Sequence, residues 1–260
     1  MEEKYDLGGE SGMKFKKGKF GLWLENFLYH YKWHTIITLF VIIVGIICTV
    51  QICSKPEYDV YIIYAGGYDA KNPESENDIP PYQTIQKSIN EAVEDFDGNG
   101  EVRSAFETLF MLSEKEIAET EKKILELKEK GEEYGEINYS QLHTNNETFR
   151  DRITFSDYYI YLISDSIYEA YQKTEGEEKV FVSLKGYVED GTEVEFLDDS
   201  AIYLSSTEFG RLPGLCDLPE NTVIVLRNIG AVSSHFNKDE ARENYSNAEK
   251  VIRNMINFKG

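Results

Sequence analysis

A short acidic segment carries the residues whose types and spacing come closest to a metal site. Asp95, Asp97 and Asn99 occupy alternate positions, a glycine follows Asn99, and Glu101 comes next. Oxygen ligands at positions 1, 3 and 5, glycine at position 6 and a backbone carbonyl at position 7 make up the first half of an EF-hand calcium loop. The spacing therefore makes Asp95, Asp97, Asn99 and Glu101 candidate ligands, with calcium as the one cofactor that the sequence suggests.

The second half of this calcium loop is missing. Calcium takes about six to eight oxygen ligands, and the loop should end with a bidentate glutamate at position 12. That position is Phe106, and Glu107 comes one residue late, so a remote carboxylate would have to complete the shell. The alternative is a tight Asp-Gly and Asn-Gly turn that joins a helix to a strand and keeps its acidic groups in water. The residue types favour the turn.

Two polar segments that follow apolar, strand-like runs form a second candidate site. In open α/β sheets, ligands bind beyond the carboxyl ends of the strands, where the loops diverge. Glycines there would allow a close backbone approach, a tyrosine would stack on a ligand, and serine and aspartate would hydrogen-bond to it. The alternative is that the glycines only form a turn and the aspartate only caps a helix. The candidate ligand-binding residues are Gly66, Gly67, Tyr68, Ser164, Asp165 and Ser166.

No catalytic motif accompanies these segments. The sequence contains no H-E-x-x-H, no G-x-S-x-G and neither of the glycine-rich phosphate-binding patterns. His143 and His235 lie far apart along the chain, and Cys216 stands in no recognisable nucleophile motif. The sequence therefore predicts a non-enzymatic protein without catalytic residues.

The charge balance argues against nucleic acid as a partner. The 260 residues carry a formal charge of −20, and residues 55–260 alone hold 21 basic and 42 acidic side chains. So acidic a surface repels phosphate backbones. The hydrophobic content of 41% is at the same time too high for an intrinsically disordered chain.

One apolar segment predicts a membrane anchor. Trp33 to Ser54 are 22 residues without a charged side chain, which as a helix cover ~33 Å, enough for a ~30 Å hydrocarbon core. A buried helix of a soluble protein seldom runs so long without a charge. A cleaved signal peptide has a shorter core of ~7–15 residues and a small-residue cleavage site, which does not precede Lys55 here. We therefore predict an uncleaved single-pass anchor.

The flanking charges predict the orientation of this anchor. Lysine excess marks the cytoplasmic side of a membrane span. Several lysines precede the segment, whereas Lys55 is followed at once by Glu57 and Asp59. We expect a cytoplasmic basic tail (residues 1–32), a transmembrane helix (33–54) in the lipid bilayer of the cell membrane, and an extracytoplasmic domain (55–260).

Hydrophobic patterning places strands and helices in the extracytoplasmic part. Strand-like runs alternate with helical patterns, which predicts an α/β domain with a mainly parallel sheet flanked by helices. Residues 131–157 are expected to be a polar connection. Strands are expected at 58–64, 102–112, 158–163, 180–188, 201–205 and 222–226, and helices at 80–96, 113–130, 165–172 and from about Asn237 onward.

Most of residues 20–260 resemble two protein groups in pattern. The strand with a small-residue turn, the amphipathic helix and the run Tyr-Tyr-Ile-Tyr-Leu-Ile-Ser-Asp at 158–165 resemble the first lobe of extracellular solute-binding proteins. The Tyr-Lys-Trp-His entry to the anchor and the acidic, tyrosine-rich body look like uncharacterised single-pass surface proteins of Firmicutes, especially clostridia. The resemblance implies a periplasmic-binding-protein-like fold with a reduced second lobe.

These observations together predict a membrane-anchored extracytoplasmic binding protein. Its partner would be a small solute or a protein of a membrane complex. The alternative is a structural or assembly component of such a complex, without a ligand cleft. An extracytoplasmic enzyme ranks third.

Overall fold

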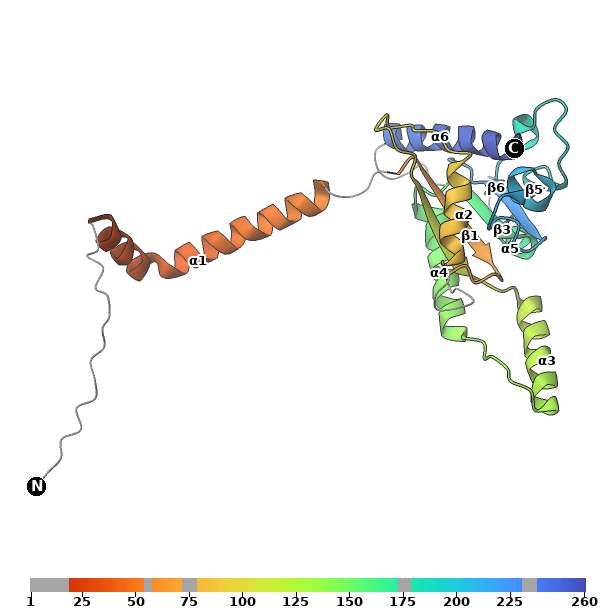
Figure 1. Cartoon of the computed structure of the whole chain (residues 1–260), viewed down its shortest axis with the longest axis horizontal. Helices are drawn as coiled ribbons and strands as arrows, with labels where there is room; N and C mark the ends of the chain where they lie inside the picture. The colour runs from red at the N-terminus through yellow and green to blue at the C-terminus, as the bar shows by residue number, and fades with distance from the viewer. Residues whose placement is uncertain (1–18, 54–57, 72–78, 173–178, 231–237) are drawn as a thin grey trace, which may run out of the picture. The chain divides into compact units, whose positions relative to one another are not determined.

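The computed structural model describes residues 19–53, 58–71, 79–172, 179–230 and 238–260 (Figure 1). These belong to two compact units, Met1–Pro56 and Glu57–Gly260, which are treated separately. The predicted helix start at Asn237 lies outside the described residues.

The described residues of the first unit form one long helix, α1 (Lys19–Cys53). Its stretch Tyr31–Val50 has a mean hydropathy of 2.3 and is long and apolar enough to cross a membrane. The predicted apolar helix is therefore present. It starts upstream of the expected residue 33, because the aromatic and aliphatic residues before Lys32 continue the helix.

The second unit is built on one six-stranded sheet with the order β2-β1-β3-β6-β5-β4. The strand β1 pairs in parallel with β2 and with β3, while the remaining three pairings are antiparallel. The expectation of a mainly parallel sheet is therefore wrong, and the sheet is mixed. The strands are β1 (Val60–Gly66), β2 (Ser104–Phe110), β3 (Ile160–Ser164), β4 (Phe196–Asp198), β5 (Ala201–Tyr203) and β6 (Thr222–Leu226).

The antiparallel half of the sheet follows a long connection after β3. This connection passes through a helix, Asp165–Gln172, and through β4 and β5, and β5 pairs antiparallel with both β4 and β6. Its length would also allow a parallel neighbour, so length alone does not set the pairing direction. The run 180–188, expected to be a strand, contributes only a bridge from Phe181 to Arg227 and the turn Lys185–Tyr187. No separate second lobe occurs among the described residues of Glu57–Gly260, which form one unit on one sheet.

Helices cover both faces of the sheet. The helices α2 (Pro81–Asn90) and α6 (Lys238–Ile256) pack on the face that carries Val60, Ile62 and Tyr64. The helices α4 (Tyr139–Phe155) and α5 (Asp165–Gln172) pack on the opposite face, which carries Ile63 and Ala65. The alternation of side chains along a strand sends these residues to opposite faces, and the double burial explains why the strand runs are continuously apolar.

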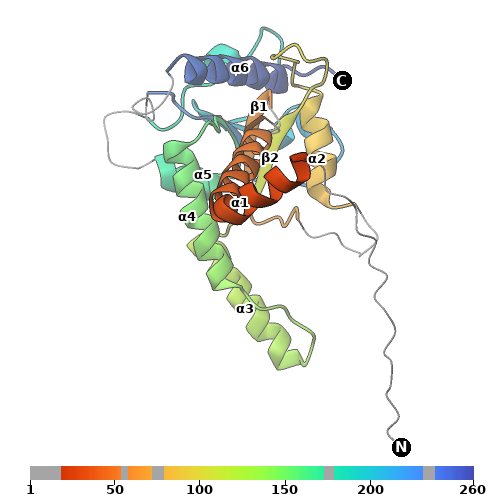
Figure 2. The ribbon, with the colours of Figure 1, turned by 90° about the vertical axis from the view of Figure 1, so that its left-hand side faces the viewer.

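The helix α3 (Glu114–Lys130) differs from the other helices of the second unit because none of its residues is buried. Both ends are formed by local signals. Ser113 and Glu116 make the predicted capping box, and Gly131 closes the helix at φ 70°. Figures 1 and 2 show α3 projecting away from the sheet, with residues 131–138 leading from its far end back to α4. We call residues 113–139 the arm.

Candidate functional site

The loop after α2 folds around the carboxylate of Asp95. Its Oδ1 accepts from the backbone N–H groups of Gly98 (2.8 Å) and Asn99 (3.2 Å), and its Oδ2 accepts from that of Gly100 (2.8 Å). Gly98 and Gly100 have φ of 72° and 87°, a region that glycine enters without a steric cost. The N–H groups, foremost that of Gly100, hold the pKa of Asp95 below its ordinary value.

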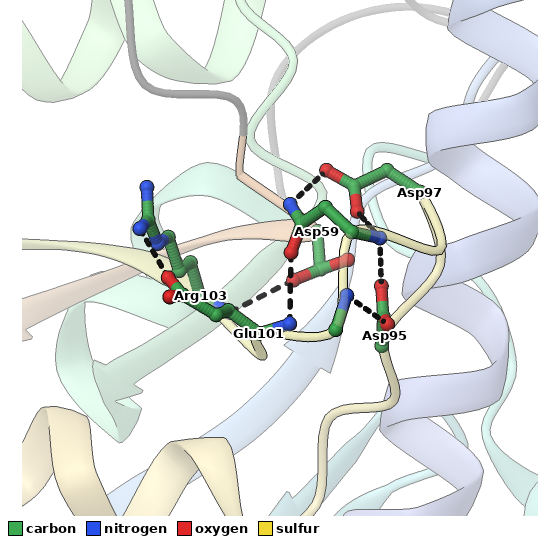
Figure 3. Close-up of polar contacts among 7 residues, drawn as sticks. Asp59, Asp95, Asp97, Glu101 and Arg103 are labelled. Atoms are coloured by element: carbon green, nitrogen blue, oxygen red, sulfur yellow. Dashed lines mark hydrogen bonds and ion pairs between the residues drawn. The ribbon is translucent and has the colours of Figure 1, made fainter.

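Besides Asp95 and Asp97, a third carboxylate reaches this loop, that of Asp59, the residue before β1. Asp59 is only 6% exposed, and its two oxygens accept from the backbone N–H groups of Phe96 (2.7 Å) and Arg103 (2.8 Å). In Figure 3, Asp59 lies between Asp95 and Asp97 on one side and Glu101 and Arg103 on the other. Carboxylate oxygens of Asp59, Asp95 and Asp97 lie within 4.8 Å of one another. The sequence analysis did not single out Asp59. Its position directly before a strand that is buried on both faces could have indicated a carboxylate with a specific partner.

The other two predicted ligands have partners inside the loop. Asn99 donates through Nδ2 to Asp97 Oδ2 (2.6 Å) and accepts at Oδ1 from the backbone N–H of Glu101 (2.8 Å). The Glu101 carboxylate forms an ion pair with Arg103. Phe106, at position 12 of the calcium pattern, lies in β2.

Internal hydrogen bonds therefore hold the loop in its conformation, and three carboxylates converge there. Hard oxygen ligands of this kind suit calcium. The set still lacks the bidentate glutamate, so the calcium site stays a prediction.

We expect Asp59→Asn to destabilise the domain even in the presence of a chelator. The amide offers one acceptor oxygen where two backbone N–H groups need acceptors, and leaving one unmet costs about 1–3 kcal/mol. That corresponds to a fall in the melting temperature of about 2–10 °C. The measurement is thermal unfolding of the full chain in detergent with EDTA. Asp157→Asn, which changes an exposed aspartate just before β3, is the matched control, and an equal effect of both substitutions would contradict this role of Asp59.

Calcium binding is tested separately with the same unfolding measurement. A calcium ion bound only to the folded chain raises its melting temperature. The rise must disappear in Asp95→Asn, since position 1 of the loop contributes a direct ligand. Identical melts with calcium and with EDTA would refute the metal site while leaving the expectation for Asp59→Asn intact.

The two predicted ligand-binding segments lie side by side at one edge of the sheet. The strands β1 and β3 are neighbours, with Ala65 opposite Ile163, so Gly66 and Ser164 come at the same level. After β1 the chain continues to α2 on one face, and after β3 it enters α5 on the other face. A point where successive connections depart to opposite faces is a topological switch point, the usual place of ligand crevices in open α/β sheets.

Gly66 and Gly67 also have a structural explanation. A Cβ on Gly66 would lie 2.6 Å from Tyr64 Oη, and one on Gly67 would lie 3.2 Å from a methyl group of Leu112. Tyr64 Oη accepts from the backbone N–H of Tyr68 (3.1 Å), and burial raises the pKa of Tyr64 so that the phenol keeps its proton. The chain's own packing is therefore a sufficient reason for Gly66, and it leaves little room for a side chain at Gly67.

The second segment forms a network at the start of α5. Ser164 Oγ and Ser166 Oγ lie 3.0 Å apart, and Ser164 Oγ accepts from the backbone N–H of Ile167 (3.4 Å). Asp165 Oδ1 accepts from the backbone N–H of Ser166 (2.7 Å) and from Asn221 Nδ2 (2.9 Å). Ser164 thus caps the helix, and Asp165 ties the start of the helix to the residue before β6. Asn221 carried no signal in the sequence because the contact joins distant parts of the chain.

A cavity of about 410 Å³ lies elsewhere in the domain. It is lined by residues 191–194, 206–208, Arg211 and 256–259. None of the six residues of the switch point is among them, so this cavity and the predicted ligand site are separate places.

Comparisons of the chain with protein-family models, with curated proteins and with solved structures give no match. The resemblance to solute-binding and clostridial surface proteins therefore stays a prediction.

Proposed function

We propose that this chain is a membrane-anchored, extracytoplasmic binding protein without enzymatic activity. The observation that carries the proposal is the switch point between β1 and β3. It gathers two glycines, a tyrosine, two serines and an aspartate from two separate segments, the kind of convergent polar group that orients a bound solute. The topology follows from α1 as the anchor, with the lysine-rich tail in the cytoplasm and residues 55–260 outside.

The chemistry at the switch point favours an uncharged polar solute. The carboxylate of Asp165 already occupies the start of α5, where a helix would otherwise attract an anion. The strongly acidic domain repels anions further. Tyr68 and Ser166 are half-buried and carry hydroxyl groups that would exchange hydrogen bonds with hydroxyl or amide groups of a solute, so sugars and polyols are the class that we propose.

Thermal unfolding of the full chain in detergent tests the solute. We expect one member of a panel of glucose, ribose and inositol to stabilise the chain by about 2.7 kcal/mol at one hundred times its Kd. The combined Ser164→Ala and Ser166→Ala variant should lose the effect, and Ser140→Ala, at an exposed serine of α4, should keep it. A panel without any effect, or an effect that survives in the combined variant, would argue against this site.

The runner-up is a structural or assembly role in a membrane complex. The specific observation in its favour is that the six residues of the switch point already satisfy one another or pack against their own chain. An exposed arm without a buried residue is a second feature that suits a protein partner. This role would be favoured over solute binding if every sugar in the panel left the melt unchanged.

A further inference from the structure

One face of α3 is open along the whole arm. Leu125 is 60% exposed, and four charged residues around it are exposed as well. Positions three and four apart are neighbours on a helix surface, so Glu121 and Lys128 flank Leu125 on one side of this face. Lys122 and Glu129 flank it on the other side. We call these five residues the arm face.

The connection back to α4 covers a neighbouring part of the helix. Tyr139 donates through its hydroxyl to Glu121 Oε1 (2.5 Å), and Lys128 Nζ lies 4.6 Å from the centre of the Tyr134 ring. The apolar residues Ile117, Ile124 and Leu127 are half-buried. The arm is thereby a self-supported unit, and the two tyrosines, 40% and 53% exposed, line one edge of the arm face.

The charges of the arm face are complementary to those of a second arm face that runs in the opposite direction. A two-fold axis through Leu125, perpendicular to the helix, sets Leu125 against its own copy. The same axis sets Glu121 opposite Lys128 and Lys122 opposite Glu129, because both pairs are centred within one residue of Leu125. Each contact occurs twice, as an isologous interface requires. A parallel two-fold arrangement would also bring opposite charges together, Glu121 with Lys122 and Lys128 with Glu129, so charge reversal has to decide between the two orientations.

We propose that the arm face binds the arm face of a second copy of this chain, in antiparallel orientation. Four opposite-charge contacts around a central leucine pair argue for the second copy, since an unrelated partner would not require this symmetry. One helix pair buries less area than a stable soluble dimer needs. The inference therefore rests on the proposed membrane anchoring, which confines the copies to two dimensions and raises their effective concentration.

Cysteine cross-linking in membranes tests the pairing. In full-length chain with Cys48, Cys53 and Cys216 replaced by serine, Leu125→Cys should form a disulfide-linked dimer on mild oxidation, because the two-fold axis brings the two thiols together. Glu119→Cys, exposed on another side of α3, is the control and should give about tenfold less dimer. Random collisions between chains would instead give similar yields at both positions.

Charge reversal identifies the orientation. Lys122→Glu in the Leu125→Cys chain should lower the dimer yield about tenfold, because it places two glutamates opposite each other on each side of the axis. Adding Glu129→Lys should restore the yield. Equal yields at positions 119 and 125, an adduct with a different protein in place of the dimer, or no rescue by the second reversal would overturn the proposal. If flotation finds the chain outside the membrane, the anchoring fails, and the same variants at high protein concentration still decide the pairing.

Discussion

Replacing Arg227 with methionine should lower the melting temperature of the domain by on the order of 10 °C. Arg227 follows β6, is fully buried, and lies over the ring of Tyr159 with a distance of 4.8 Å from its guanidinium carbon to the ring centre. Its Nη1 donates to the backbone carbonyls of Arg152 and Ile153, each at 2.9 Å. Its Nη2 donates to the carbonyl of Ser156 (2.5 Å).

The size of this effect follows from the place of the three carbonyls. They belong to the end of α4, where a helix leaves carbonyl groups without intrahelical partners and where a positive charge is stabilising. Methionine fills similar space but donates no hydrogen bond. Leaving three wholly or partly buried acceptors unmet at about 1–3 kcal/mol each gives a loss of about 3–5 kcal/mol in the free energy of unfolding.

Near-UV circular dichroism of the tyrosines is the suitable measurement for Arg227→Met. Both tryptophans, Trp23 and Trp33, lie in α1, so tryptophan fluorescence does not follow the domain. Arg211→Met is the control, because that side chain is 67% exposed and pairs with Glu208 at the surface, where an ion pair is worth under about 1 kcal/mol. Shifts of similar size in both variants would show that the carbonyl contacts contribute little.

Replacing Leu39 and Ile42 of α1 with arginine should remove the chain from the membrane fraction. Leu39 and Ile42 lie near the centre of the apolar stretch Tyr31–Val50. An arginine at the centre of a spanning helix costs about 2.5–3.5 kcal/mol, so the double substitution costs about 6 kcal/mol in addition to the lost apolar contribution.

Flotation after alkaline extraction measures the result. The conservative pair Leu39→Ile and Ile42→Leu should behave as the unchanged chain. Protease added to intact cells tests the orientation in the same material, since it should remove residues 55–260 from the anchored chain. Recovery of the unchanged chain in the soluble fraction, or a domain that intact cells protect, would overturn the anchored topology.

Local signals predicted those elements whose residues suffice to define them. The helix Asp165–Gln172 and the strand Thr222–Leu226 have the expected bounds, and the capping box of Ser113 begins α3 as expected. In each case the apolar spacing and the cap lie within a few residues. No distant contact is needed to recognise them.

Elements that depend on distant contacts were missed or misjudged. The helix α4 buries only Leu142, Phe149 and Ile153, a stripe too narrow to stand out in a polar segment. The run 180–188 has strand composition, but only Phe181 meets a neighbouring strand. Pairing direction likewise depends on where the chain goes after β3, which residue patterns do not contain.

The same distinction applies to the candidate sites. The alternation of Asp95, Asp97 and Asn99 identified the loop, and the strand ends identified Gly66 and Ser164 as neighbours. Asp59 and Asn221 escaped notice because each completes its network from a remote part of the chain. Residues that close a site across the fold become visible only when the fold is known.

The self-capped arm has a consequence for how this architecture can change over evolutionary time. Because α3 starts and stops by its own signals and contributes no residue to the core, whole turns can be inserted or deleted there at almost no cost to the sheet. Related chains would then differ in the reach of this helix while their strands stay alike. Selection can accordingly change the spacing between neighbouring molecules by changing the length of the arm.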